Sequence, residues 1–124
     1  MTRISSIILI LVINYSLYAD PLSEDDLRNR SYKHYRNGLN EYNKENYSSA
    51  LVELETSIKY RSTKKARKLT EDIHKKGISY YDSGVALLNF NRELAKQYLE
   101  KALPLIDPQN KKTKEHINSL LKSL

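Results

Sequence analysis

The side chains of this sequence that could do acid–base or metal chemistry are histidines and carboxylates, and neither group is spaced for it. The three histidines, His34, His74 and His116, are 40 and 42 residues apart, and none has a second ligand at helical spacing. Carboxylate pairs such as Glu71 and Asp72 are adjacent, and adjacent positions on a helix do not converge on one substrate. With no cysteine and no glycine-rich phosphate loop, we expect no catalytic residue, no metal and no cofactor.

Tyrosine is the residue type best suited to binding in this chain. There are ten tyrosines against one phenylalanine and no tryptophan, and tyrosine offers a large rigid face with a polar tip. Tyr32, Tyr35, Leu39 and Tyr42 recur at spacings of three and four, which places them on one face of a helix. Such a face either lines a binding surface or packs between helices with its hydroxyls in water, and the spacing alone does not decide between the two.

Basic residues are the second candidate for binding. The net charge is +6. Lys64, Lys68 and Lys75 share one face of a predicted helix, and Lys65 adjoins them. This basic face could bind an anionic membrane, a polyanion or an acidic protein. A solvated helix face has the same composition, so that interpretation stays open beside the functional one.

The N-terminus predicts export. One charged residue, Arg3, precedes seven consecutive apolar residues at 7–13, and a more polar stretch then ends in Ala19. This order is typical of a signal peptide, and the apolar run is shorter than the about 20 residues that a transmembrane helix needs. We expect a signal peptide at 1–19 and an exported domain at 20–124, most readily in a bacterial periplasm, where no nucleic acid is expected as a partner. Since Leu17 is bulkier than usual for its place, an uncleaved N-terminus tethered to the inner membrane is the alternative.

The rest of the chain predicts an all-α fold of antiparallel helical hairpins. Three glycines and three prolines in 124 residues leave little turn chemistry for a many-stranded β fold. Apolar residues recur at helical spacing, and Ser23 is followed by three acids, a typical helix start. Pro104 should kink or end the fourth helix. The five expected helices span about residues 23–44, 47–60, 63–89, 92 to the bend at Pro104, and 109–124.

Two segments of the chain repeat each other. Residues 46–54 and 91–99 each begin with a polar turn and continue as a helix with an alanine and, four residues later, a leucine. A glycine precedes each alanine by eleven or twelve residues. Because glycine and alanine are small, they let two antiparallel helices approach closely while the leucines fill the space beside them. The matching positions are Gly38, Ala50 and Leu54 in the first copy and Gly84, Ala95 and Leu99 in the second.

This pattern resembles the tetratricopeptide repeat. Tyr47 and Ser57 extend the match in the first copy, and Ala102 and the closing Asp107-Pro108 extend it in the second. The resemblance covers about residues 32–124, and it implies repeat one at about 25–60, repeat two at about 63–107 and a capping helix at about 109–124. The packing positions that it assigns are Gly38, Tyr47, Ala50, Leu54, Gly84, Ala95, Leu99 and Ala102.

The chain also departs from that family. The two alanines are 45 residues apart, against a family period of about 34. The excess of 11 corresponds to three turns at about 3.67 residues each, so it should lengthen the third helix without rotating its apolar face. Arg92 stands where the family usually has an aromatic residue, and two repeats are fewer than the about three usually needed for stability. An ordinary helical bundle is the alternative.

In tetratricopeptide proteins the first helix of each pair lines a concave groove. The resemblance therefore implies a non-enzymatic scaffold or adaptor of the cell envelope that binds a peptide or protein partner. The alternative is a module that binds an anionic membrane or polyanion through its basic face. No oligomeric state follows from the sequence. The groove residues implied are Tyr32, Tyr35, Leu39, Tyr42, Asn43 and Tyr80, and the basic face comprises Lys64, Lys65, Lys68 and Lys75.

Overall fold

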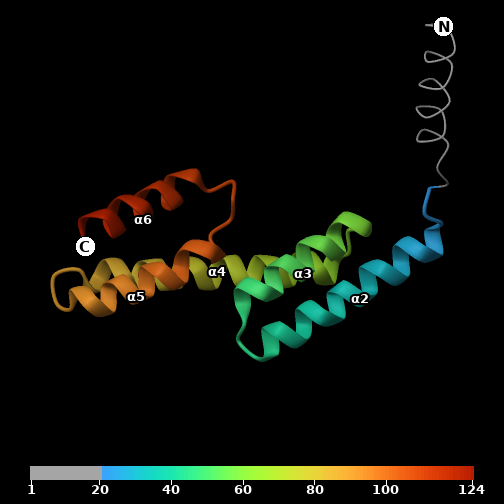
Figure 1. Cartoon of the computed structure of the whole chain (residues 1–124), viewed down its shortest axis with the longest axis horizontal. Coiled ribbons are helices and arrows are strands. Elements are labelled where there is room, and N and C mark those ends of the chain that lie inside the picture. The colour runs from blue at the N-terminus through green and yellow to red at the C-terminus, as the bar shows by residue number, and fades with distance from the viewer. Residues whose placement is uncertain (1–20) are drawn as a thin grey trace, which may run out of the picture.

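The computed structural model describes residues 21–124, so the signal peptide predicted at 1–19 lies outside the described residues. Within them the fold is all-α, as predicted, with no strand (Figure 1). None of the described helices has the length and apolar character required to span a membrane. The elements are α2 (Glu24–Asn43), α3 (Tyr47–Tyr60), α4 (Lys64–Leu87), α5 (Arg92–Ala102), the 3-10 helix η1 (Leu103–Leu105) and α6 (Lys111–Ser123).

Side-chain caps set the start of four of these helices. In each case a side-chain oxygen accepts a hydrogen bond from the backbone N–H three residues on, which satisfies a donor that has no partner inside the helix. The cap residues are Ser23, Thr63, Asn91 and Asn110. Helix α4 ends at Leu87 rather than at the predicted Asn89. Helix α5 ends at Ala102, and η1 follows because Pro104 cannot continue the helical hydrogen bonding.

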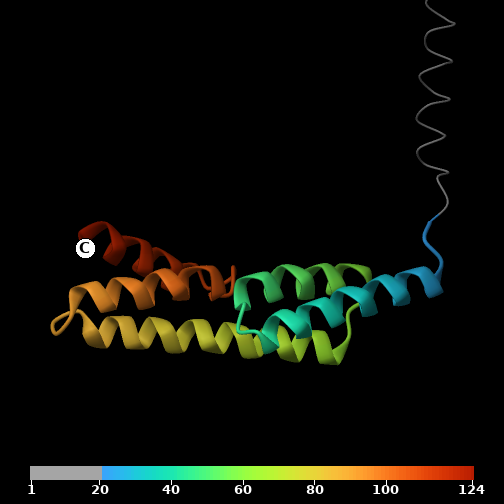
Figure 2. The ribbon, with the colours of Figure 1, turned by 60° about the horizontal axis from the view of Figure 1, so that its bottom comes forward.

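Helix α4 is the longest element, and two other helices pack along it. Figure 2 shows α3 and α5 one beyond the other along α4, with α2 beside α3 and α6 beside α5. The buried residues of α4 are Ala66, Ile73, Gly77 and Gly84, at spacings of seven, four and seven. These spacings put all four on one stripe, so α4 runs unbroken with its apolar face aligned, as the excess of three turns predicted.

The two helical hairpins close through equivalent contacts. A Cβ atom placed on Gly38 would lie 2.8 Å from Leu54 Cγ, and one placed on Gly84 would lie 2.8 Å from Leu99 Cγ. Neither distance is compatible with a side chain at the glycine unless the leucine moves. A larger residue where α2 meets α3 or where α4 meets α5 would therefore require the facing leucine to shift.

A third close approach joins η1 to α4, and the repeat pattern did not predict it. A Cβ atom on Gly77 would lie 2.9 Å from the carbonyl carbon of Leu105 and 2.9 Å from its Cβ. One turn away, His74 Nδ1 lies 2.9 Å from the Leu105 carbonyl oxygen. Because a carbonyl only accepts, His74 must carry its proton on Nδ1 and donate it. The backbone of η1 thus packs directly on α4.

This contact connects two hydrophobic clusters. Leu105 belongs to the first cluster and the next residue, Ile106, to the second, and the half-buried Tyr80 packs against both. Burial of the two consecutive side chains in different clusters fixes the direction in which the chain leaves α5. The buried residues are Ala50, Leu51, Leu54, Ala66, Ile73 and Leu105 in the first cluster, and Leu99, Ala102, Ile106 and Ile117 in the second.

We predict that Gly77→Ala lowers the free energy of unfolding. Overpacking costs about 1–3 kcal/mol, which outweighs the gain of about 1 kcal/mol from replacing a helical glycine, because the added methyl meets backbone that cannot rotate away. Gly38→Ala is the matched control, since its methyl meets only side-chain atoms of Leu54 at closest range. Urea unfolding should show the larger loss for Gly77→Ala; equal stability of Gly77→Ala and the parent would contradict the contact.

Candidate functional site

A cleft lies between α2 and the start of α4. It has a volume of about 170 Å³. A second cleft of about 260 Å³ shares Tyr35 and Lys65 with the first, so the two adjoin; together they are called the tyrosine–cation cleft below. The residues that line the first part are Arg28, Ser31, Tyr32, Tyr35, Arg61, Thr63 and Lys65, and the second part adds Lys68, Leu69 and Asp72.

The two tyrosines of this cleft have different surroundings. Tyr35 is half-buried and packs against the first hydrophobic cluster, so it forms the floor. Tyr32 is 58% exposed, and its hydroxyl accepts a hydrogen bond of 3.2 Å from Arg36. That hydrogen bond raises the pKa of the Arg36 guanidinium above its usual value. Tyr32 is therefore an aromatic side chain held at the cleft mouth with most of its surface available to a ligand.

The cations of the cleft are largely free of acidic neighbours. In residues 21–124, Arg61, Lys65 and Lys68 take part in no ion pair, and Arg28 has only a long, exposed contact of 3.7 Å with Asp25. The first turn of α4 contains Lys65 and no acid, an arrangement that the helix dipole disfavours. The result is a local excess of positive charge around an aromatic floor.

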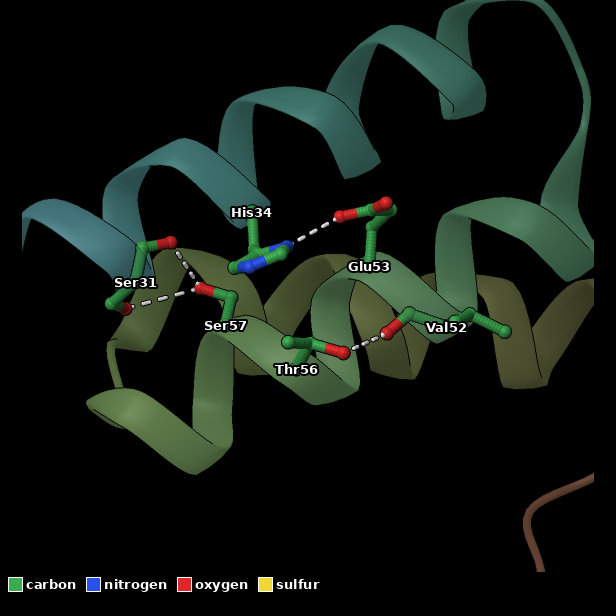
Figure 3. A network of polar contacts seen from close by, with 6 residues as sticks. All are labelled: Ser31, His34, Val52, Glu53, Thr56 and Ser57. Carbon is green, nitrogen blue, oxygen red and sulfur yellow. Dashed lines mark hydrogen bonds and ion pairs between the residues drawn. The ribbon is translucent and has the colours of Figure 1, made fainter. Parts of the chain in front are cut away.

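Two buried serines, Ser31 and Ser57, pair across α2 and α3 (Figure 3). The Ser31 hydroxyl donates to the Arg61 carbonyl oxygen at 2.9 Å, and the Ser57 hydroxyl donates to the Ser31 carbonyl oxygen at 2.7 Å. Each hydroxyl has one proton, so these two bonds account for both, and the two hydroxyl oxygens lie 3.1 Å apart. Beside them, His34 Nδ1 lies 2.7 Å from Glu53 Oε2. These contacts fasten α2 to α3 and fix the backbone of Arg61 against α2.

The structure divides the six residues predicted to line one groove. Tyr32 and Tyr35 share the tyrosine–cation cleft, whereas Tyr80 lines a separate cleft of about 400 Å³ with Tyr47 and Lys101, between the start of α3 and the end of α5. The physical reason is the length of α4: fifteen residues separate Lys65 from Tyr80, or about 22 Å along the helix. Tyr80 therefore lines a different cleft from Tyr32 and Tyr35, although Tyr35, Tyr42 and Tyr80 all pack against the first hydrophobic cluster. The groove of six residues stays a prediction.

The other residues predicted for the groove, Leu39, Tyr42 and Asn43, do not line the tyrosine–cation cleft. Tyr42 is half-buried and packs edge-on against Tyr47, with ring centroids 5.5 Å apart. Leu39 is half-buried, and Asn43 is exposed at the end of α2. Of the predicted basic face, Lys65 and Lys68 line the cleft. Lys64 and Lys75 are exposed but do not line it.

Several residues of the cleft were not among those predicted to form a site. Arg28, Ser31 and Thr63 have no partner at a regular spacing that would single them out, and Arg61 is one of 21 lysines and arginines in the sequence. One feature of the sequence does mark Ser31: it is a small polar residue two helical turns before Gly38, on the same face of the helix. Its partner Ser57 lies on another helix, so the pairing is visible only after folding.

The three histidines each connect two elements. His34 links α2 to Glu53 of α3, His74 links α4 to η1, and His116 accepts or donates a hydrogen bond with Tyr81 of α4. In residues 21–124 no group of three metal-ligating side chains comes together. The histidines thus serve packing, and the exposed chemistry of the cleft is aromatic and cationic. Comparison with known protein families, with curated proteins and with solved structures found no match.

We predict that Ser31→Ala destabilises the fold by about 1–3 kcal/mol, because it leaves the Arg61 carbonyl oxygen without its donor. Urea unfolding measures the change, and Ser79→Ala on the exposed side of α4 is the matched control, expected within about 0.5 kcal/mol of the parent. Since Ser31 and Ser57 share one network, the loss in the double alanine variant should be smaller than the sum of the single losses. Simple additivity would contradict the network.

A second stability prediction concerns Lys76, whose Nζ lies 5.1 Å from the ring centroid of Tyr47 and 5.9 Å from that of Tyr42. Burial lowers the pKa of Lys76, but its interactions with Tyr47 and Tyr42 outweigh burial and leave the pKa above 10.5. The ammonium is therefore charged at neutral pH, and Lys76→Met should cost about 0.5–1 kcal/mol.

Because the folded-state pKa of Lys76 is raised, its contribution is complete below the unfolded-state pKa and is lost as the pH rises through the folded-state value. Urea unfolding near neutral pH should therefore separate Lys76→Met from the parent, and the gap should narrow above pH 10.5. Lys75→Met, at the exposed neighbouring position, is the matched control. A gap that widens at high pH would contradict the interaction.

Proposed function

We propose that this protein is a non-enzymatic scaffold of the cell envelope, and that its tyrosine–cation cleft holds a segment of a protein partner. The observation that carries the proposal is the meeting of Tyr32 and Tyr35 with Arg61 and Lys65 in one concavity. Tyrosine and arginine are the residues that most often dominate binding energy at protein interfaces. The cleft has the features of a docking site for a side chain, since it combines a half-buried aromatic floor with an open mouth.

The proposal includes a tetratricopeptide-like architecture. What supports it is the equivalent closure of the two hairpins, at Gly38 with Leu54 and at Gly84 with Leu99. In this proposal the three extra turns of α4 place the packing site of α5 further along α4. The binding cleft is then confined to the first hairpin and the start of α4, instead of continuing from repeat to repeat.

Export is a further part of the proposal. It is supported by the order of residues at 1–19, with one basic residue, an apolar run and a small residue at the end. A second candidate function is binding to an anionic membrane through the basic face. The exposure of Lys64, Lys68 and Lys75 on one side of α4 favours it. Charge-driven binding of that kind weakens steeply at high ionic strength, whereas docking of an aromatic side chain persists.

The proposal predicts that a photo-cross-linking residue captures a partner from the cleft mouth. p-Benzoylphenylalanine replaces Tyr32, which is exposed in the cleft, or Val52, which is 62% exposed on α3 and lines none of the clefts described. After irradiation of cells that express the protein and a high-salt wash, we expect one protein adduct from position 32 and none from position 52. Equal adducts from both positions, or no adduct from either, would contradict a docking site in this cleft.

A further inference from the structure

We infer that the partner segment held by the tyrosine–cation cleft is acidic and presents one apolar side chain between its carboxylates. This inference rests on the proposed function and narrows it to a class of ligand. It depends on two properties of the cleft, the size of its enclosed part and the sign of the charge around it, which are independent of each other.

The enclosed part of the cleft has the size of one side chain. Its volume is about 170 Å³, and a protein cavity of about 150 Å³ holds one benzene ring. The ring of Tyr35 and the exposed ring of Tyr32 provide the aromatic surface. A phenylalanine or leucine side chain therefore fits this part of the cleft.

The charges around this volume select acidic flanks. Arg28, Arg61 and Lys65 line the same part of the cleft as the two tyrosines, and no carboxylate lines that part. Arg61 and Lys65 have no ion-pair partner within residues 21–124. A glutamate or aspartate beside the inserted side chain would form ion pairs with these cations, and a lysine there would be repelled.

The partner segment can continue from the first part of the cleft into the second part. It shares Tyr35 and Lys65 with the first part and ends beside Leu69 and Asp72. The far end carries Lys68 beside Asp72, so its charges are mixed. Carboxylates of the ligand are therefore favoured most near Arg61, where no acid lines the cleft. A concave site between two helices fits a peptide segment better than a flat lipid surface, and this geometry decides for a protein partner.

The experiment uses the purified full-length protein and three synthetic peptides of equal length. In the first, glutamates flank a central phenylalanine; in the second, glutamates flank a central alanine; in the third, lysines flank a central phenylalanine. Fluorescence anisotropy measures each Kd. We expect the first peptide to bind at least about tenfold more tightly than the other two, because only it fills the aromatic volume and matches the charge.

Variants then locate the binding. Lys65→Glu should weaken the first peptide at least about tenfold, and Tyr32→Ala should weaken it through loss of aromatic contact. Lys112→Glu, which makes the same charge change at an exposed position of α6 outside both parts of the cleft, should leave its Kd within about twofold. Circular dichroism shows that each variant is folded.

The outcomes separate this inference from the proposed function. If position 32 still cross-links a partner but the first peptide binds no better than the lysine peptide, the inference is wrong and the proposed function stands. If neither cross-linking nor peptide binding occurs, both are wrong. Binding to phosphatidylglycerol vesicles that is lost in Lys65→Glu, unchanged in Tyr32→Ala and unaccompanied by peptide binding would overturn a protein partner in favour of a lipid surface.

Discussion

The direct packing of η1 on α4 at Gly77 is the contact on which the rest of this structure depends. There is no room for a Cβ atom between Gly77 and the backbone of Leu105, and His74 fixes the same carbonyl group by a hydrogen bond. With η1 held at this point, Leu105 enters one hydrophobic cluster and Ile106 the other. Two helical hairpins that have no helix in common thereby become parts of one packed body.

The length of α4 decides which surfaces of the other helices lie side by side. Helices α3 and α5 pack one beyond the other on a single buried stripe of α4. The second hairpin therefore lies further along α4, and the start of α4 remains beside α2. That start carries Lys65 and Lys68, and the facing turn of α2 carries Tyr32 and Tyr35. The aromatic and the basic surfaces, which look like alternatives in the sequence, meet in one cleft.

The polar side chains inside the fold serve its packing. Ser31, Ser57 and His74 each bond across two elements, and within residues 21–124 no buried side-chain nitrogen or oxygen is left without a partner. An unpaired polar group in the interior would cost about 1–3 kcal/mol, so such pairing is required wherever helices approach this closely. The buried polar groups are thus paired, whereas Tyr32 and the cations of the tyrosine–cation cleft are exposed.

The helices, the cap at Ser23 and the small residues at Gly38 and Gly84 could be predicted from the sequence, because spacing, capping and side-chain size act over a few residues. The cleft could not. Arg61 and Tyr32 line one cleft, where the Ser31 hydroxyl binds the Arg61 backbone. Tyr80 lines another cleft, further along the continuous helix α4. The requirement for a small residue at Gly77 depends on η1, which packs against it in the folded chain. Contacts between distant segments depend on how whole helices pack, and no local rule contains that information.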